Sequence, residues 1–312
     1  MENGRQQLGI KAQSQLVARS HLNSIDKEPQ MIRIIPRLDI KGPNLVKGVN
    51  LEGLRVLGKP EAFAAHYYAQ GADELIYMDM VASLYNRNHL SDIVRKTAEE
   101  ALIPLTVGGG IRSLNDIREV LRAGADKVII NTAAIENPDI IRQAAQRFGS
   151  STVVASLEVI DLGDGNYECL THCGREVTGV EPVSWAKELE ELGAGEICLT
   201  AIAMEGTGNG FDIDLVNRIA TSVAIPVIAH GGAGTSEDVL SVIRDGAADA
   251  VCIASMFHYE AIDSIDWSKE DYSAEGNTEF VKSRRKFHHF DAIGIKELKH
   301  YLGANKIMVR SI

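Results

Sequence analysis

The chain has 312 residues, 45% of them hydrophobic and 24% charged, so it is long enough to bury a sizeable core. Its formal net charge of −11, without a long basic run, argues against nucleic acid as the main partner. Since its strongly apolar runs are only as long as strands, none is expected to span a membrane.

Residues 1–30 lack the apolar stretch of a signal peptide, and polar and charged residues dominate them. This segment is predicted to be a disordered extension ahead of a single domain over residues 31–312. The four cysteines match neither a disulfide framework nor a paired zinc site. We therefore expect no metal, no other cofactor and a reducing, cytoplasmic location.

Short apolar runs alternate with amphipathic stretches along almost all of the remaining chain. Near-continuous apolar strands separated by helices indicate a parallel sheet covered by helices. Eight such repeats favour a closed (β/α)8 barrel over an open doubly wound sheet, which usually carries a glycine fingerprint after its first strand. The expected strands are 32–40, 74–79, 103–107, 127–131, 152–159, 196–201, 226–229 and 250–254, and the expected helices include 60–70, 90–101, 115–123, 138–148, 183–192, 212–221 and 236–245.

Three segments depart from this alternation. The first loop, 41–59, contains several glycines and has the length of a mobile lid. Residues 159–171, with Gly163-Asp164-Gly165, are predicted to form a small hairpin after the fifth strand. A polar stretch at about 261–290 is predicted to be a surface insertion before a last helix near 295–302.

One strand–turn–helix–turn–strand unit occurs twice, as IPLTVGGGIRSLNDIREVLRAGADKVIINTAA from Ile103 and IPVIAHGGAGTSEDVLSVIRDGAADAVCIASMF from Ile225. Glycine allows the backbone to approach a ligand closely, and a helix start offers free N–H groups to an anion. Each unit ends with a small hydroxyl residue, Thr132 or Ser255. The duplication predicts two fused half-barrels and a substrate with a phosphate at both ends. Alternatively, the glycines only form tight turns.

Two carboxylates end matching strands of the two halves: Asp39 the first strand and Glu158 the fifth. Reacting groups of (β/α)8 barrels stand at the carboxyl ends of strands, so this pair is a candidate acid and base. Lys47 follows in the first loop. The alternatives are a salt bridge or rim carboxylates for the acids, and a solvated charge for the lysine.

The segments RIIPRLDIKGPNLVKG, TVGGGI, GADKVIINTAA, GAGEI and AHGGAG resemble the HisF family, the cyclase subunits of imidazole glycerol phosphate synthase. The resemblance implies a barrel that binds the bisphosphorylated ribonucleotide PRFAR. It also implies a HisH-type glutaminase partner, docked on the opposite face, that supplies ammonia for conversion of PRFAR to imidazole glycerol phosphate and AICAR in histidine biosynthesis.

The same resemblance assigns residues to roles. Asp39, Glu158 and Lys47 are implied to be catalytic. The phosphate groups would be held by Gly109, Gly110 and Thr132 on one side, and by Gly231, Gly232, Ala254 and Ser255 on the other. Arg33, Glu74, Lys127 and Glu196 would form an ammonia gate at the barrel floor, although they could instead merely close that floor.

The departures from the family pattern lie on the substrate face. Glu158 replaces an aspartate, Arg37 a cysteine and His230 a serine, while Ala203 and Glu205 replace an acidic pair. A carboxylate moved by about 1 Å can cost about a hundredfold in rate. The alternative function is therefore a non-cyclising relative that conducts ammonia to a sugar amidotransferase in surface-polysaccharide synthesis. A sugar-phosphate isomerase barrel is a third possibility, which the retained gate disfavours.

Overall fold

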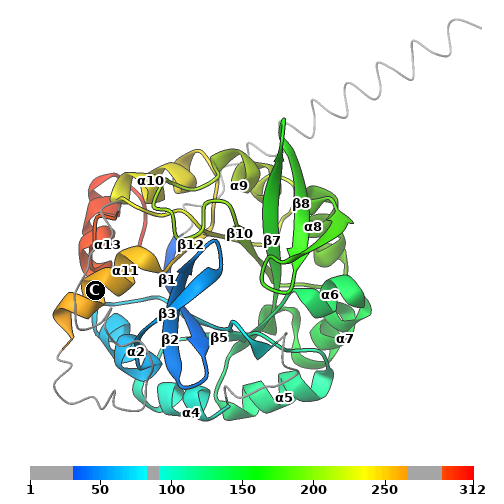
Figure 1. The fold of residues 1–312 in the computed structure, drawn as a ribbon, viewed down its shortest axis with the longest axis horizontal. Coiled ribbons are helices and arrows are strands. Elements are labelled where there is room, and N and C mark those ends of the chain that lie inside the picture. Colours follow the sequence, from blue (N-terminus) through cyan, green and yellow to red (C-terminus); the bar gives the residue numbers. More distant parts are fainter. Residues whose placement is uncertain (1–30, 83–90, 266–289) are drawn as a thin grey trace, which may run out of the picture. The chain divides into compact units, whose positions relative to one another are not determined.

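The computed structural model describes residues 31–82, 91–265 and 290–312. Its centre is a closed ring of eight parallel strands, in which β7 pairs with β10 to complete the barrel (Figure 1). The (β/α)8 architecture predicted from the sequence is therefore confirmed. In order around the ring, the strands are β1 (Arg33–Lys41), β4 (Leu75–Asp79), β5 (Leu105–Gly108), β6 (Lys127–Ile130), β7 (Val153–Gly163), β10 (Glu196–Ala201), β11 (Val227–His230) and β12 (Ala250–Ile253).

Helices surround the strands, as the ribbon shows (Figure 1). The two sequence repeats have matching helix starts, because Ser113 and Thr235 each cap a helix with an aspartate three residues later that bonds back to the cap. The helices are α2 (Pro60–Ala69), α4 (Ser91–Glu100), α5 (Leu114–Ala123), α6 (Thr132–Glu136), α7 (Asp139–Phe148), α8 (Pro182–Glu191), α9 (Ile213–Ala220), α10 (Ser236–Arg244), α11 (Ser255–Ser264) and α13 (Ile295–Ala304), with a 3₁₀ turn η1 (Ser150–Thr152).

Alternate residues of each strand face the barrel interior or the helices. On β1, Ile34 and Leu38 belong to the apolar core shared with the helices, whereas Ile35 belongs to a second cluster inside the barrel. The same alternation directs Arg33, Arg37 and Asp39 inward. The interior therefore has a charged floor, an apolar middle and a polar upper layer. The apolar middle includes Ile35, Ile76, Ile129, Val154, Cys198, Ile228 and Ala250.

The segment 41–59, expected to be a mobile loop, is an antiparallel hairpin of β2 (Asn44–Val49) and β3 (Glu52–Gly58). It forms because β1 continues past Asp39 and pairs with β2, so that Asp39 lies opposite Val46. Leu45 and Val46 are buried against the barrel. The expectation of a loop was wrong because these apolar residues pair with β1, and the turn is formed by Asn50 and Leu51, with φ +53° and +62°, rather than by the glycines.

The hairpin after β7 is larger than the sequence suggested. β7 pairs with β8 (Asn166–Thr171), and β8 pairs with an additional strand, β9 (Glu176–Val180). The predicted insertion at 261–290 overlaps the buried end of α11, and its residues 266–289 lie outside the described ones, as does the extension 1–30. No helix that the structure describes is long and apolar enough to cross a membrane.

Candidate active site

The two predicted carboxylates lie at the carboxyl ends of β1 and β7, which are four strands apart in either direction around the ring. The side chains of Asp39 and Glu158 are 2% and 4% exposed. The negative charge of Asp39 contributes to raising the pKa of Glu158. The structure therefore brings the two candidate acid–base groups into one electrostatic environment, above the apolar middle of the barrel.

Arg37 completes this environment from inside β1. Its Nε donates to Asp39 Oδ1 at 2.8 Å, and its Nη1 lies 3.5 Å from Thr200 Oγ1 and 3.3 Å from His230 Nδ1. Burial and the charges of Arg37 and Lys47 hold the pKa of His230 well below its ordinary value, so its ring is neutral and accepts from Arg37. The guanidinium thus links three strands of the upper layer.

Glu158 has no arginine or lysine as a hydrogen-bond donor among the described residues. Its Oε2 accepts the backbone N–H of Gly174 at 2.8 Å, in the turn between β8 and β9. Burial raises the pKa of Glu158 to about 7, against the opposing charge of Arg37 and the Gly174 bond. A carboxyl group with this pKa is suited to give and accept protons near neutral pH.

Lys47 lies on β2 and forms a buried ion pair with Glu205, in the segment after β10. The other oxygen of Glu205 accepts the backbone N–H of Leu51 at 2.8 Å. The Glu205 carboxylate therefore contacts both the β2 strand and the turn of the β2–β3 hairpin. Lys47 also lines a cavity between this hairpin and Tyr259 of α11. The structure therefore places Lys47 next to the candidate site, with its charge already paired.

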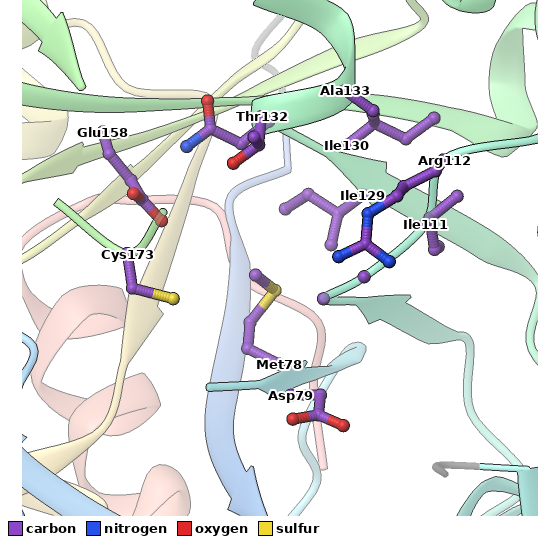
Figure 2. Close-up of a pocket in the computed structure, with 13 residues that line it drawn as sticks. Met78, Asp79, Ile111, Arg112, Ile129, Ile130, Thr132, Ala133, Glu158 and Cys173 are labelled. Carbon is purple, nitrogen blue, oxygen red and sulfur yellow. The ribbon is translucent and has the colours of Figure 1, made fainter. Parts of the chain in front are cut away.

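The first predicted phosphate cradle lies in a small pocket beside Glu158. Gly109 has φ +97°, and a Cβ there would lie 2.4 Å from the carbonyl oxygen of Asp79, so only glycine fits. Thr132 begins α6, and its hydroxyl accepts the backbone N–H of His172 at 3.1 Å. Figure 2 shows the pocket. It is lined by Met78, Asp79, Gly109, Gly110, Ile111, Arg112, Ile129, Ile130, Asn131, Thr132, Ala133, Glu158 and Cys173.

The second predicted cradle is built in the same way on the opposite half. Gly231 and Gly232 follow β11 with φ +97° and +110°, and a Cβ at Gly232 would lie 1.8 Å from the carbonyl oxygen of Gly210. Ala254 and the buried Ser255 form the start of α11. The backbone N–H groups at such a helix start can bind an anion. Both halves of the barrel therefore present a glycine turn beside a helix start at the site's rim.

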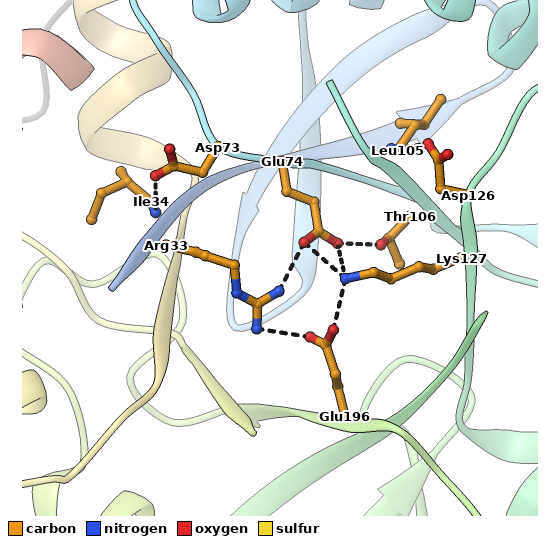
Figure 3. Close-up of polar contacts among 9 residues, drawn as sticks. All are labelled: Arg33, Ile34, Asp73, Glu74, Leu105, Thr106, Asp126, Lys127 and Glu196. Carbon is orange, nitrogen blue, oxygen red and sulfur yellow. Dashed lines mark hydrogen bonds and ion pairs between the residues drawn. The ribbon is translucent and has the colours of Figure 1, made fainter. Parts of the chain in front are cut away.

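The four predicted gate residues form a closed ring of ion pairs at the floor of the barrel (Figure 3). Arg33 donates to Glu74 and to Glu196, each at 2.9 Å. Lys127 donates to Glu74 at 3.0 Å and to Glu196 at 2.7 Å. Positive and negative side chains therefore alternate, and each charge has two opposite neighbours. Such mutual pairing offsets the cost of burying the charges.

The site also contains residues to which the sequence analysis gave no role: Arg37, Thr200, His230 and Asn131. A sequence signal did exist for Arg37, because it precedes Asp39 by two residues in one strand and must face the same side. Asn131 lines the pocket, and its Oδ1 is buried without a hydrogen-bond partner. Among the described residues, no group of three or more His, Cys, Asp or Glu side chains could hold a metal ion.

Comparisons with known proteins match this architecture. The model of the family described as histidine biosynthesis protein matches residues 33–263. The imidazole glycerol phosphate synthase subunit HisF of Legionella pneumophila is 59% identical over 207 residues, which cover 66% of this chain and 98% of that protein. HisF of Alkaliphilus metalliredigens (strain QYMF) is 47% identical over 230 residues, which cover 74% and 91%. The chain therefore belongs to the histidine biosynthesis protein family, as a barrel of the HisF type.

Proposed function

We propose that this chain is the cyclase subunit of imidazole glycerol phosphate synthase, a lyase that acts with a glutaminase partner. It takes ammonia from that partner and converts PRFAR to imidazole glycerol phosphate and AICAR. The observation that carries the proposal is the pair of glycine cradles on opposite halves, with Asp39 and Glu158 between them. A substrate with two phosphates would be held at both ends, with its reacting carbons above the two carboxylates.

The floor ring supports an ammonia route from the opposite face. Its four charges stand directly below the apolar middle layer, which leads up to Arg37 and Asp39. A neutral ammonia molecule can pass apolar side chains at far lower cost than an ammonium ion. A HisH-type glutaminase docked at the floor would then deliver ammonia inside the barrel, away from solvent.

The direct test is an assay of the purified protein with PRFAR and concentrated ammonium salt, without a partner. We expect loss of PRFAR and appearance of AICAR. Asp39→Asn should lower this turnover by about a hundredfold or more. Asp92→Asn, which changes an exposed carboxylate on α4, should leave it unaltered. Full turnover in Asp39→Asn, or none in the folded wild-type protein, would contradict a cyclase that works through these carboxylates.

The glutaminase route needs a separate measurement with the partner added. Glu74→Gln removes one negative charge from the ring while keeping a side chain of the same size. We expect it to reduce glutamine-dependent turnover more than ammonium-dependent turnover, because added ammonia can enter from the substrate face. Equal reduction of the two activities would argue against a route through the ring.

A second candidate function is supported by the ion pairs on the substrate face. Asp39 is bound to Arg37 and Lys47 to Glu205, so two of the three predicted catalytic groups already have buried partners. A subunit that only conducts ammonia to another synthase, such as a sugar amidotransferase, needs the ring but not PRFAR chemistry. This function predicts tight binding of a glutaminase, measured by calorimetry, together with no PRFAR turnover.

A further inference from the structure

Arg37 is a buried arginine of the upper layer and holds Asp39 in one orientation. Both side chains are 2% exposed, and the 2.8 Å bond joins Arg37 Nε to Asp39 Oδ1. The far end of the guanidinium is anchored by neutral His230 at 3.3 Å. Thr200 Oγ1 lies 3.1 Å from the same His230 nitrogen, so the anchor is itself fixed. Arg37 is thus held at both ends.

One carboxylate oxygen of Asp39 is not bonded to Arg37. Arg37 occupies Oδ1, and no hydrogen bond from the described residues reaches Oδ2. Oδ2 is therefore the oxygen of Asp39 that can contact a substrate.

Glu158 has the opposite environment. The charged groups that face it are Arg37 and Asp39 of β1, and its polar neighbours are Asn131 of β6 and the N–H of Gly174. None of these is a cationic donor bonded to its carboxyl group. Burial therefore dominates, and Glu158 exchanges its proton near neutral pH. Two carboxylates with environments this different are suited to two different roles.

We propose that Arg37 is a positioning residue that holds Asp39 by Oδ1, so that Oδ2 faces the substrate while Glu158 carries the proton of the reaction. The inference rests on the proposed cyclase function. Ammonia forms an N–C bond to a carbonyl carbon of the substrate while the π electron pair moves to the carbonyl oxygen. Ionised Glu158 takes one proton from the nitrogen and returns it to that oxygen, which restores the carboxylate. Asp39 Oδ2 stabilises the positive charge on the nitrogen meanwhile.

Carbon NMR of side-chain carboxyl groups tests the assignment without any activity. The protein is labelled at its Asp and Glu carboxyl carbons, and the two signals are assigned by their loss in Asp39→Asn and Glu158→Gln. Between about pH 6 and 8 we expect the Glu158 signal to move. A constant Glu158 signal would overturn the proposal.

Two variants of Arg37 test whether its charge affects the titration of Glu158. Arg37→Met removes the charge and keeps an unbranched chain, whereas Arg37→Lys keeps the charge. Loss of the cation should raise the titration midpoint of Glu158 by about 1 unit, and the Lys variant should stay near the wild type. An unchanged midpoint in Arg37→Met would overturn the electrostatic link. Arg37→Lys and the wild-type titration remain informative even if the Met variant does not fold.

Kinetics separate the positioning role from mere structural support. In the ammonium-dependent assay, Arg37→Met should lower kcat at least about tenfold with little change in KM, and Arg37→Lys should restore part of it. Residual turnover of Asp39→Asn should keep the wild-type pH dependence near neutrality, and Glu158→Gln should lose it. Loss of that dependence in Asp39→Asn would make Asp39 the proton carrier. If the wild type has no turnover, the proposed function fails while the NMR result still decides the role of Arg37.

Discussion

Replacing Glu158 with glutamine should change how the stability of the barrel depends on pH. Glutamine has the size of a protonated glutamic acid but cannot ionise. The wild-type carboxyl has an ordinary pKa of 4.5 when unfolded and about 7 in the fold, because burial disfavours its charge. The folded state therefore holds a proton that the unfolded state has lost over this range. The contribution of Glu158 to the free energy of unfolding therefore falls as pH rises from about 4.5 to about 7.

The expected size follows from the shift itself. Each pKa unit corresponds to about 1.36 kcal/mol, so a shift from 4.5 to about 7 corresponds to about 3 kcal/mol. Below about pH 4.5 the wild type and Glu158→Gln should have similar stability. Above about pH 7 the variant should be more stable by about 3 kcal/mol, because it does not bury a charge there.

Urea denaturation of both proteins at a series of pH values measures this difference directly. Subtracting the two curves removes the contributions of all groups that titrate equally in both. Glu297→Gln, an exposed change on α13, serves as the matched control. A difference between wild type and Glu158→Gln that does not change with pH would refute the raised pKa, and with it the assignment of Glu158 as the proton carrier.

Three further substitutions test the supports of the site. Glu74→Gln leaves two ring cations with a single carboxylate and should destabilise the fold by about 3 kcal/mol, measured by urea denaturation. Gly232→Ala should cost at least about 2 kcal/mol and abolish phosphate binding measured by calorimetry, whereas Gly303→Ala, in open space on α13, should stabilise by up to about 1 kcal/mol. Lys47→Met should cost about 3–5 kcal/mol, since it leaves the Glu205 carboxylate buried without its cation, and Lys47→Arg should recover part of that loss.

The barrel itself could be predicted from the sequence because its signals are local. Apolar runs recur eight times, some of them beside capping residues and glycine turns, and the observed barrel strands differ from the predicted ranges mainly at their ends. At the second repeat the hydroxyl cap Thr235 and its partner Asp238 mark the start of α10 directly. The duplicated units made the two glycine turns visible for the same reason.

The upper layer of the site could not be predicted because its contacts join distant parts of the chain. Arg37 and His230 are separated by 193 positions, and Lys47 and Glu205 by 158. The sequence placed these residues on the substrate face, but it could not show which of them contact one another. The β2–β3 hairpin was missed for a related reason, since its pairing depends on β1 extending beyond Asp39. Only the fold brings these side chains together.

The residues that depart from the HisF pattern on the substrate face are coupled to one another through charge. Arg37 neutralises Asp39 and bonds His230, while Glu205 neutralises Lys47. Glu158 has no cationic hydrogen-bond partner among the described residues, and burial raises its pKa to about 7, so that it can be protonated near neutral pH. Changing Arg37 alone to an uncharged residue would remove the cation that opposes the raised pKa of Glu158 and the donor that holds Asp39 and His230. Arg37 is therefore the residue through which the departures at this face act on one another.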